Sequence, residues 1–185
     1  LLGSVSASGG TVTLTSAVNI TDNNAGTSNI AAANAVLTAA GDIGGFGNAL
    51  ETTVTTAVDA TSTASTKGIY LDNGATNLTS LSAEVVGGNV SIAFGTTPFS
   101  FTASTGLLTL AANPNLTLEF RNLGGNIVLG GLDIGTKTLM LEAAGSITQS
   151  GSNRLVAGTA TLIAGQNIGD LNPLTPSALL TNVGT

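Results

Sequence analysis

The chain has 185 residues and a formal net charge of −6, from ten acidic and four basic residues. This balance argues against nucleic-acid binding, which needs clustered Lys and Arg. Hydrophobic residues reach 42% but charged residues only 8%, whereas disordered chains are poor in Val, Ile and Leu and rich in charge. No apolar stretch reaches the roughly 18 residues of a membrane-spanning helix. We therefore expect one folded domain, no nucleic-acid partner and no membrane insertion of this segment.

A ten-residue template recurs along the chain from the N-terminus. Its second residue is apolar, its fourth is Leu, its sixth is Ser or Ala and its tenth is Ile or Leu. It fits from Thr11, Asn34, Leu107, Thr138 and Thr159. Alternate residues of a strand face the same side, so the second, fourth and sixth positions form one inward row. The starts are 23, 73, 31 and 21 residues apart. These spacings predict coils of about 20–24 residues, with about three coils inside the long gap.

Further strand-like runs lie between the template copies, and most are bounded by Gly, Asn, Asp or Ser, which favour turns. They are residues 52–58, 68–71, 83–94, 99–102 and 115–120. Helix signals are weak, and the best candidate, residues 31–40, overlaps the template. We predict an all-β fold, a single-stranded parallel β-helix (β-solenoid). A β-sandwich or barrel is the alternative, but neither ordinarily repeats one Leu-x-Ala/Ser row at coil spacing.

The end of the sequence repeats its beginning. Residues 11–21 match 138–148 at an offset of 127, residues 35–44 match 160–169 at 125, and residues 48–50 match 172–174 at 124. Self-similarity at a fixed period is typical of tandem arrays. We expect residues 1–185 to form one continuous solenoid segment, about one and a half copies of a repeat of about 125 residues, and to be a fragment of a longer chain.

The sequence offers little catalytic chemistry. It has no His and no Cys, so Ser-His-Asp and Cys-His mechanisms and His- or Cys-based metal sites are unavailable within the chain. The four basic residues are spread along the sequence: Lys67, Arg121, Lys137 and Arg154. Arg121 lies two residues from Glu119, which predicts a surface ion pair. We expect no enzyme activity, no catalytic residue, no cofactor and no metal; an enzyme built on carboxylates is the third alternative.

Two Asp/Asn runs are the richest in oxygen ligands of the kind that calcium prefers, Asp22-Asn23-Asn24 and Asp72-Asn73-Gly74. Neither matches the Gly-Gly-x-Gly-x-Asp pattern of calcium-binding β-rolls, and we interpret both as turns. Residues 41–47 are rich in Gly, as phosphate-binding loops are, but no Lys follows them and the template places them at a coil corner.

Three features are candidates for binding surfaces. The Thr rows 11–15 and 52–56 are ordinary outward strand positions or, alternatively, hydroxyl ladders of an ice-binding kind. Phe94, Phe99 and Phe101 lie near Pro98 and either fill a local widening of the core or form an exposed aromatic patch. Residues 21–33 and 96–104 are candidate recognition loops.

Residues 37–44 followed by Asn48-Ala49-Leu50 resemble the repeats of large secreted bacterial exoproteins of the filamentous-haemagglutinin type, which leave the cell by two-partner secretion. Residues 68–73, and Ile168-Gly169 followed by residues 172–174, are similar to the same repeats. The resemblance implies a right-handed parallel β-helix, an extracellular or cell-surface location in a bacterium, and service as a rod or adhesive stalk.

We therefore expect a structural, non-enzymatic rod or fibre segment of a secreted or surface-attached bacterial adhesin. Its partners would be further repeats of the same chain or other copies joined end to end. The alternative is a surface-binding module that recognises a glycan, a host surface or ice through its loops or Thr ladders.

Overall fold

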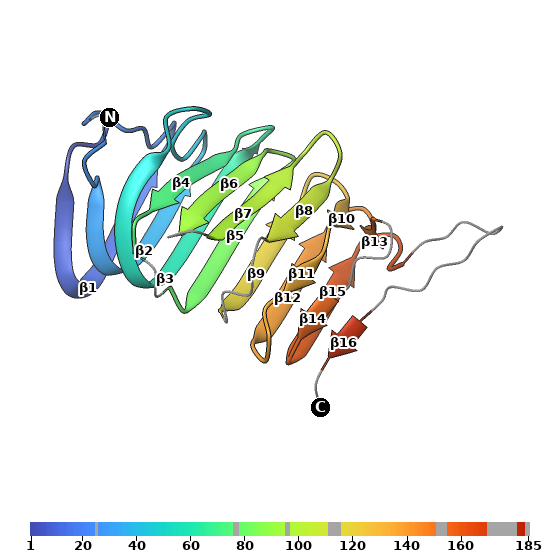
Figure 1. Ribbon diagram of the computed structural model, residues 1–185. Helices are drawn as coiled ribbons and strands as arrows, with labels where there is room; N and C mark the ends of the chain where they lie inside the picture. Colours follow the sequence, from blue (N-terminus) through green and yellow to red (C-terminus); the bar gives the residue numbers. More distant parts are fainter. Residues whose placement is uncertain are drawn as a thin grey trace.

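In the computed structural model, which describes residues 1–24, 26–75, 78–94, 97–110, 116–150, 155–169 and 181–183, every helix or strand assigned is a β-strand. In chain order the strands are β1 (Val5–Ser16), β2 (Ile30–Ala39), β3 (Leu50–Ser65), β4 (Ile69–Asn73), β5 (Ser80–Val86), β6 (Val90–Phe94), β7 (Thr97–Thr102), β8 (Leu107–Leu110), β9 (Thr117–Asn122), β10 (Ile127–Leu129), β11 (Leu132–Asp133), β12 (Thr138–Ala143), β13 (Ile147–Gln149), β14 (Leu155–Ala157), β15 (Thr159–Ala164) and β16 (Thr181–Val183). They wind into a stack of coils (Figure 1).

One side of the stack, wall one, is a continuous parallel ladder of β1, β2, β3, β5, β9, β12 and β15. Equivalent positions on these strands are residues 11, 34, 57, 80, 117, 138 and 159. Five of the six intervals between equivalent positions on neighbouring strands are therefore 21 or 23 residues long. The predicted parallel β-solenoid, with coils of about 20–24 residues, is confirmed.

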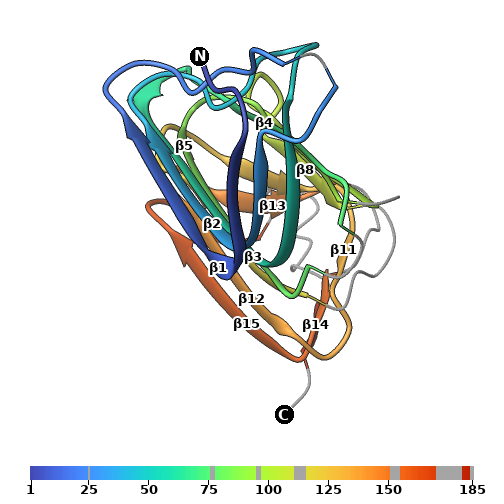
Figure 2. The same cartoon turned by 90° about the vertical axis from the view of Figure 1, so that its left-hand side faces the viewer.

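Two further sides close each coil. Wall two contains β4, β6, β7, β8, β10 and β13, and wall three contains β11, β14 and β16. The long strands β1 and β2 bend where their register shifts, after Ala7 and after Ala32, because such irregularities increase local bending. Figure 2, which looks along the stack, shows the walls enclosing a narrow interior.

The template residues of the interior coils form the core, as predicted, whereas in the last coil Leu162 is only partly buried and Ile168 is 49% exposed. Leu14 pairs with Leu37 and Leu141 with Leu162 in the fourth-position row, and at the corner Ile20, Ile43 and Ile69 follow one another from coil to coil. Leu37, Leu141 and Ile43 are fully buried. Burial of each such side chain contributes about 1.5–3 kcal/mol, so repeating one pattern in every coil produces a continuous core.

The template copy predicted at Leu107 is wrong. Residues 107–110 form β8, which belongs to wall two and pairs with β10, Leu108 beside Leu129. The error arises because an inward-outward alternation looks the same on any wall. The true neighbour of β5 in wall one is β9, a step of 37 residues from Ser80 to Thr117.

The additional residues of that long step form an antiparallel insertion that the sequence reading did not predict. β6 pairs with β7, and β7 with β8, both antiparallel. Wall two therefore contains two additional strands, β7 and β8, in a coil in which wall one has no additional strand. The coil widens locally.

The first two pairs of matched blocks of the long repeat occupy equivalent places, on wall one and at the corner that follows it. In the third pair, residues 172–174 lie outside the described residues. Neighbouring coils also have a wall-one strand and a corner at these places, so the equivalence does not distinguish a long period from the short coil repeat. The period of about 125 residues therefore stays a prediction. The right-handed winding also stays a prediction.

Candidate functional site

The described residues hold no group of three or more His, Cys, Asp or Glu side chains placed to bind a metal ion. The same part of the chain contains no helix with the length and hydrophobicity to cross a membrane.

The first Asp/Asn run forms part of a polar network at a corner. Oδ1 of the buried Asp22 accepts hydrogen bonds from the backbone N–H of Asn24 (2.8 Å) and from the side chain of Asn29 (2.9 Å). Asn29 is fully buried, and its Oδ1 accepts a hydrogen bond from the Glu51 N–H in the next coil (3.0 Å). Much of the proposed recognition loop 21–33 is therefore fixed in place, and its last residues belong to β2.

The second run separates into two faces of β4. Asn73 points inward, where its amide donates to the Val54 carbonyl (2.9 Å) and accepts from the Val54 N–H (2.7 Å) and the Thr52 hydroxyl (3.0 Å). Asp72 points outward and is exposed. Because adjacent strand residues face opposite sides, the two side chains do not converge on one ion.

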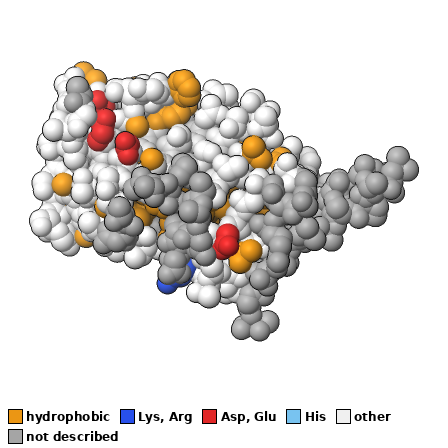
Figure 3. Space-filling view, in the orientation of Figure 1, with side chains coloured by type: hydrophobic (Ala, Val, Ile, Leu, Met, Phe, Trp, Pro, Cys, Tyr) orange, Lys and Arg blue, Asp and Glu red, His pale blue; other side chains and the backbone are white. Residues whose placement is uncertain are grey.

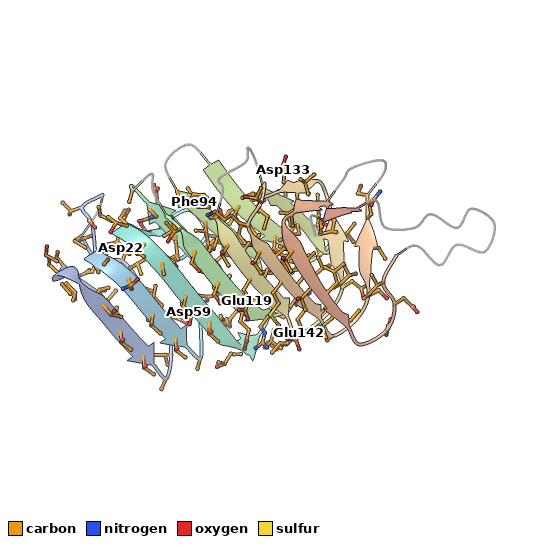
Figure 4. The ribbon with its side chains drawn as sticks, turned by 90° about the horizontal axis from the view of Figure 1, so that it is seen from below. Asp22, Asp59, Phe94, Glu119, Asp133 and Glu142 are labelled. Carbon is orange, nitrogen blue, oxygen red and sulfur yellow. The ribbon has the colours of Figure 1, made fainter. Side chains whose placement is uncertain are left out.

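Arg121 lies in a cluster of three glutamates on the outer face of wall one. Its Nη1 donates a hydrogen bond to Oε2 of Glu84 (3.0 Å), and its Nε lies 2.9 Å from Glu142 Oε2 and 3.3 Å from Glu119 Oε1. Figure 4 shows Glu119 and Glu142 close together at this wall. The predicted ion pair with Glu119 is present, and the register adds two partners that the sequence reading missed.

The other basic residues lie elsewhere. Nζ of Lys67 is 3.3 Å from Oδ2 of Asp42 at a corner, Lys137 is exposed, and Arg154 lies outside the described residues.

The Thr rows do not continue as long hydroxyl ladders. Thr15, Thr38 and Thr61 are neighbours on the outside of wall one, but the same row continues as Glu84, Arg121 and Glu142. Thr52 points inward and is buried. The outward-strand interpretation therefore holds for Thr13, Thr15, Thr53 and Thr55, which are exposed, and is wrong for Thr52.

The Phe residues fill the core rather than form an exposed patch. Phe94, Phe99 and Phe101 are buried, and the rings of Phe99 and Phe101 lie 5.7 and 4.9 Å from that of Phe120 on wall one. Most of the proposed loop 96–104 is thus strand β7, and Thr96 lies outside the described residues.

A surface hollow with a volume of about 520 Å³ lies on the outer face of wall two; we call it the wall-two groove. Its lining includes Phe46, Glu51, Tyr70, Asp72, Ser91 and Ser100. Figure 3 shows acidic and hydrophobic side chains close together on the N-terminal half of the visible face, with basic side chains away from them.

Residues 44–49 form one bank of the groove, and the sequence explains why. Ile43 pairs with Ile69 and Leu50 pairs with Leu71, only two positions farther along β4, so the intervening residues are pushed outward. Reciprocal Gly45–Asn48 backbone hydrogen bonds of 2.8 and 3.0 Å close the loop. Gly44 has φ of +70°, and a Cβ there would collide with the Tyr70 carbonyl oxygen. The loop thereby lies directly against β4.

Phe46 projects from the tip of this loop and is 91% exposed. Its ring meets that of Tyr70 edge to face, with centroids 6.2 Å apart. The sequence reading noted the glycines of this loop but not the Phe between them. A large apolar residue flanked by Gly in a turn was the available signal, because a turn tip offers it nothing to pack against.

Comparison of the chain with protein-family models, curated proteins and solved structures gave no significant match. The resemblance to filamentous-haemagglutinin-type repeats therefore stays a prediction.

Proposed function

We propose that this chain is a structural rod segment of a secreted or surface-attached bacterial adhesin, which extends and presents binding regions or assembles into an extracellular filament. The observation that carries the proposal is the in-register parallel ladder of wall one, which continues through seven strands. In such a stack each coil mainly contacts its neighbours, so the object lengthens by addition of coils.

The two ends of wall one support continuation. Within the described residues, β1 pairs with β2 alone and β15 with β12 alone, so each presents an unpaired strand edge. Open edges bind further strands unless they are covered. Continuation by coils of the same chain, or by a second copy, would satisfy these backbone groups.

The adhesin part of the proposal is supported by the similarity of residues 37–50 to the repeats of secreted bacterial exoproteins. The low charge and the Thr-, Ser- and Asn-rich composition are consistent with a rod whose stability comes from ladders and a narrow core rather than from surface ion pairs.

Cysteine crosslinking tests end-to-end assembly of copies, because the native sequence has no Cys. Thr13 on β1 and Thr161 on β15 occupy equivalent outward positions, and both are exposed. If β15 of one copy stacks in register on β1 of the next, their Cα atoms lie about 4.8 Å apart, within the range for a disulfide.

We expect Thr13→Cys and Thr161→Cys proteins, mixed under mild oxidation, to form a disulfide-linked heterodimer in preference to either homodimer. Thr63→Cys is the control partner for Thr13→Cys, because Thr63 is exposed but lies on β3, in the interior of the stack. Equal crosslinking of the control pair, or no heterodimer, would contradict end-to-end stacking of copies.

A further inference from the structure

We infer that the wall-two groove is a binding site for a neutral saccharide. The inference is independent of the rod proposal, because a groove on the outside of a coil needs neither end of the stack. It rests on the exposed ring of Phe46, on the polar floor below it, and on an unsatisfied buried carboxylate oxygen.

The groove has a flat floor made by neighbouring strands. Tyr70, Ser91 and Ser100 lie side by side on β4, β6 and β7, because they are in register along the ladder. Glu51 and Asp72 form a second row, in register on β3 and β4. The floor therefore presents hydroxyl and carboxylate groups in two parallel rows.

Phe46 overhangs this floor from the loop of residues 44–49. Since the side chain is 91% exposed, its ring is available to a ligand, while the edge-to-face contact with Tyr70 supports its position. The C–H face of a sugar ring packs against an aromatic face, and sugar hydroxyls pair with hydroxyl and carboxylate groups. A groove of about 520 Å³ is in the range of small-ligand sites.

Glu51 supplies the observation that points most directly to a missing donor. Its Oε2 is buried and makes no hydrogen bond, and a buried acceptor without a partner is costly. A ligand hydroxyl would donate to it once the Glu51 side chain turns toward the groove, because this oxygen is closed to solvent in the unbound structure. The described residues contain no group of three or more acidic side chains placed to bind a metal ion, which favours a polyhydroxyl ligand over calcium.

The charge of the groove selects among saccharides. Glu51 and Asp72 are directly opposite each other across the ladder, and no Lys or Arg is among the described residues that line the groove. Sialylated and sulfated glycans would meet like charges. Neutral glycans would not.

The test is binding of the full chain to a panel of immobilised neutral, sialylated and sulfated oligosaccharides, followed by titration of the best neutral glycan. Phe46→Ala is the test variant. Val18→Ala is the matched control, because Val18 is also an exposed apolar side chain, 70% exposed, and is not among the residues lining the groove. Both variants should melt at the wild-type temperature.

We expect retention of neutral glycans, affinity at least tenfold weaker in Phe46→Ala, and affinity within twofold of wild type in Val18→Ala. Three results would overturn the inference: no retained glycan, retention of sialylated or sulfated glycans alone, or equal affinity of wild type and a folded Phe46→Ala. None of these outcomes bears on end-to-end stacking, which the crosslinking experiment tests separately.

Discussion

At the scale of single residues, Arg121 shows how stacking determines electrostatics. Its pKa is raised above the ordinary arginine value, first by the hydrogen bond to Glu84 and then by the charges of Glu142, Glu84 and Glu119, while partial burial opposes the shift. A raised pKa of a basic group means that its contribution to stability is complete at lower pH and is lost only as pH rises through the folded-state value. That loss lies in the strongly alkaline range.

Replacement of Arg121 should therefore cause a loss of stability that depends on the glutamates. In Arg121→Gln, three carboxylates remain close together without a cation, and they repel one another. We expect a loss of about 1 kcal/mol at pH 7, a modest value because the side chain is 35% exposed and solvent screens it.

Urea denaturation at pH 7 measures the loss. Lys67→Gln is the control, since Lys67 forms a single, more exposed ion pair with Asp42, and it should change stability by less than about 0.5 kcal/mol. An Arg121→Gln protein as stable as wild type at neutral pH would contradict the expectation.

The sequence contained part of this cluster. Glu119 is two positions from Arg121, so the strand period alone places both side chains on one face. Glu84 and Glu142 are 37 and 21 residues away, and their proximity follows only from the register. Glu84 could not be predicted as a neighbour of Arg121, because their separation of 37 residues is longer than an ordinary coil.

At the scale of elements, the antiparallel insertion β6–β7–β8 is the main departure from a regular coil. Phe99 and Phe101 on β7 are packed against Phe120 of wall one. In the inward row of wall one, Phe120 is the neighbour of Ala83 and of Leu141. A large ring beside a small residue fills the space created where wall two gains strands.

Phe120→Ala should therefore be severely destabilising. The side chain is fully buried, and removing a buried Phe costs about 3–5 kcal/mol through lost burial and the cavity that remains. Thermal or urea unfolding measures the loss. Phe46→Ala removes the same atoms from an exposed position and should leave stability unchanged; a Phe120→Ala cost below about 1 kcal/mol would show that the insertion is not packed as described.

The parallel ladders were predictable from sequence, and the insertion was not. The template residues around Leu14, Leu37, Leu141 and Leu162 repeat at coil spacing because each coil places the same inward position in the core. An antiparallel strand has the same alternation as a parallel one, so Leu107–Leu110 matched the template although it lies on another wall. Pro98 and the grouped Phe residues indicated a widening, but not the strand direction that produces it.

At the scale of the whole molecule, the wall-two groove depends on elements that are distant in sequence. Phe46 comes from the loop before β3, Asp72 from β4 and Ser100 from β7, with β6 between the two strands. These side chains line one groove only because the loop before β3 is pushed outward and because β7 is inserted beside β6. Of the two recognition loops proposed from the sequence, residues 96–104 contribute Ser100 and Thr102 to the groove lining, whereas no residue of 21–33 is among the lining residues.

The stack itself determines the shape on which the proposed function depends. Seven strands of wall one are separated by six steps of about 4.8 Å, a length of about 29 Å. Further coils, or further copies in register, would extend the same axis without a new kind of contact.

The most direct test of this account is electron microscopy of the native, full-length assembly, with two-dimensional averaging and diffraction from aligned particles. We predict a thin rod with a repeat near 4.8 Å along its long axis, continuous across any junction between copies. A compact particle without an axial repeat of that spacing would contradict the rod.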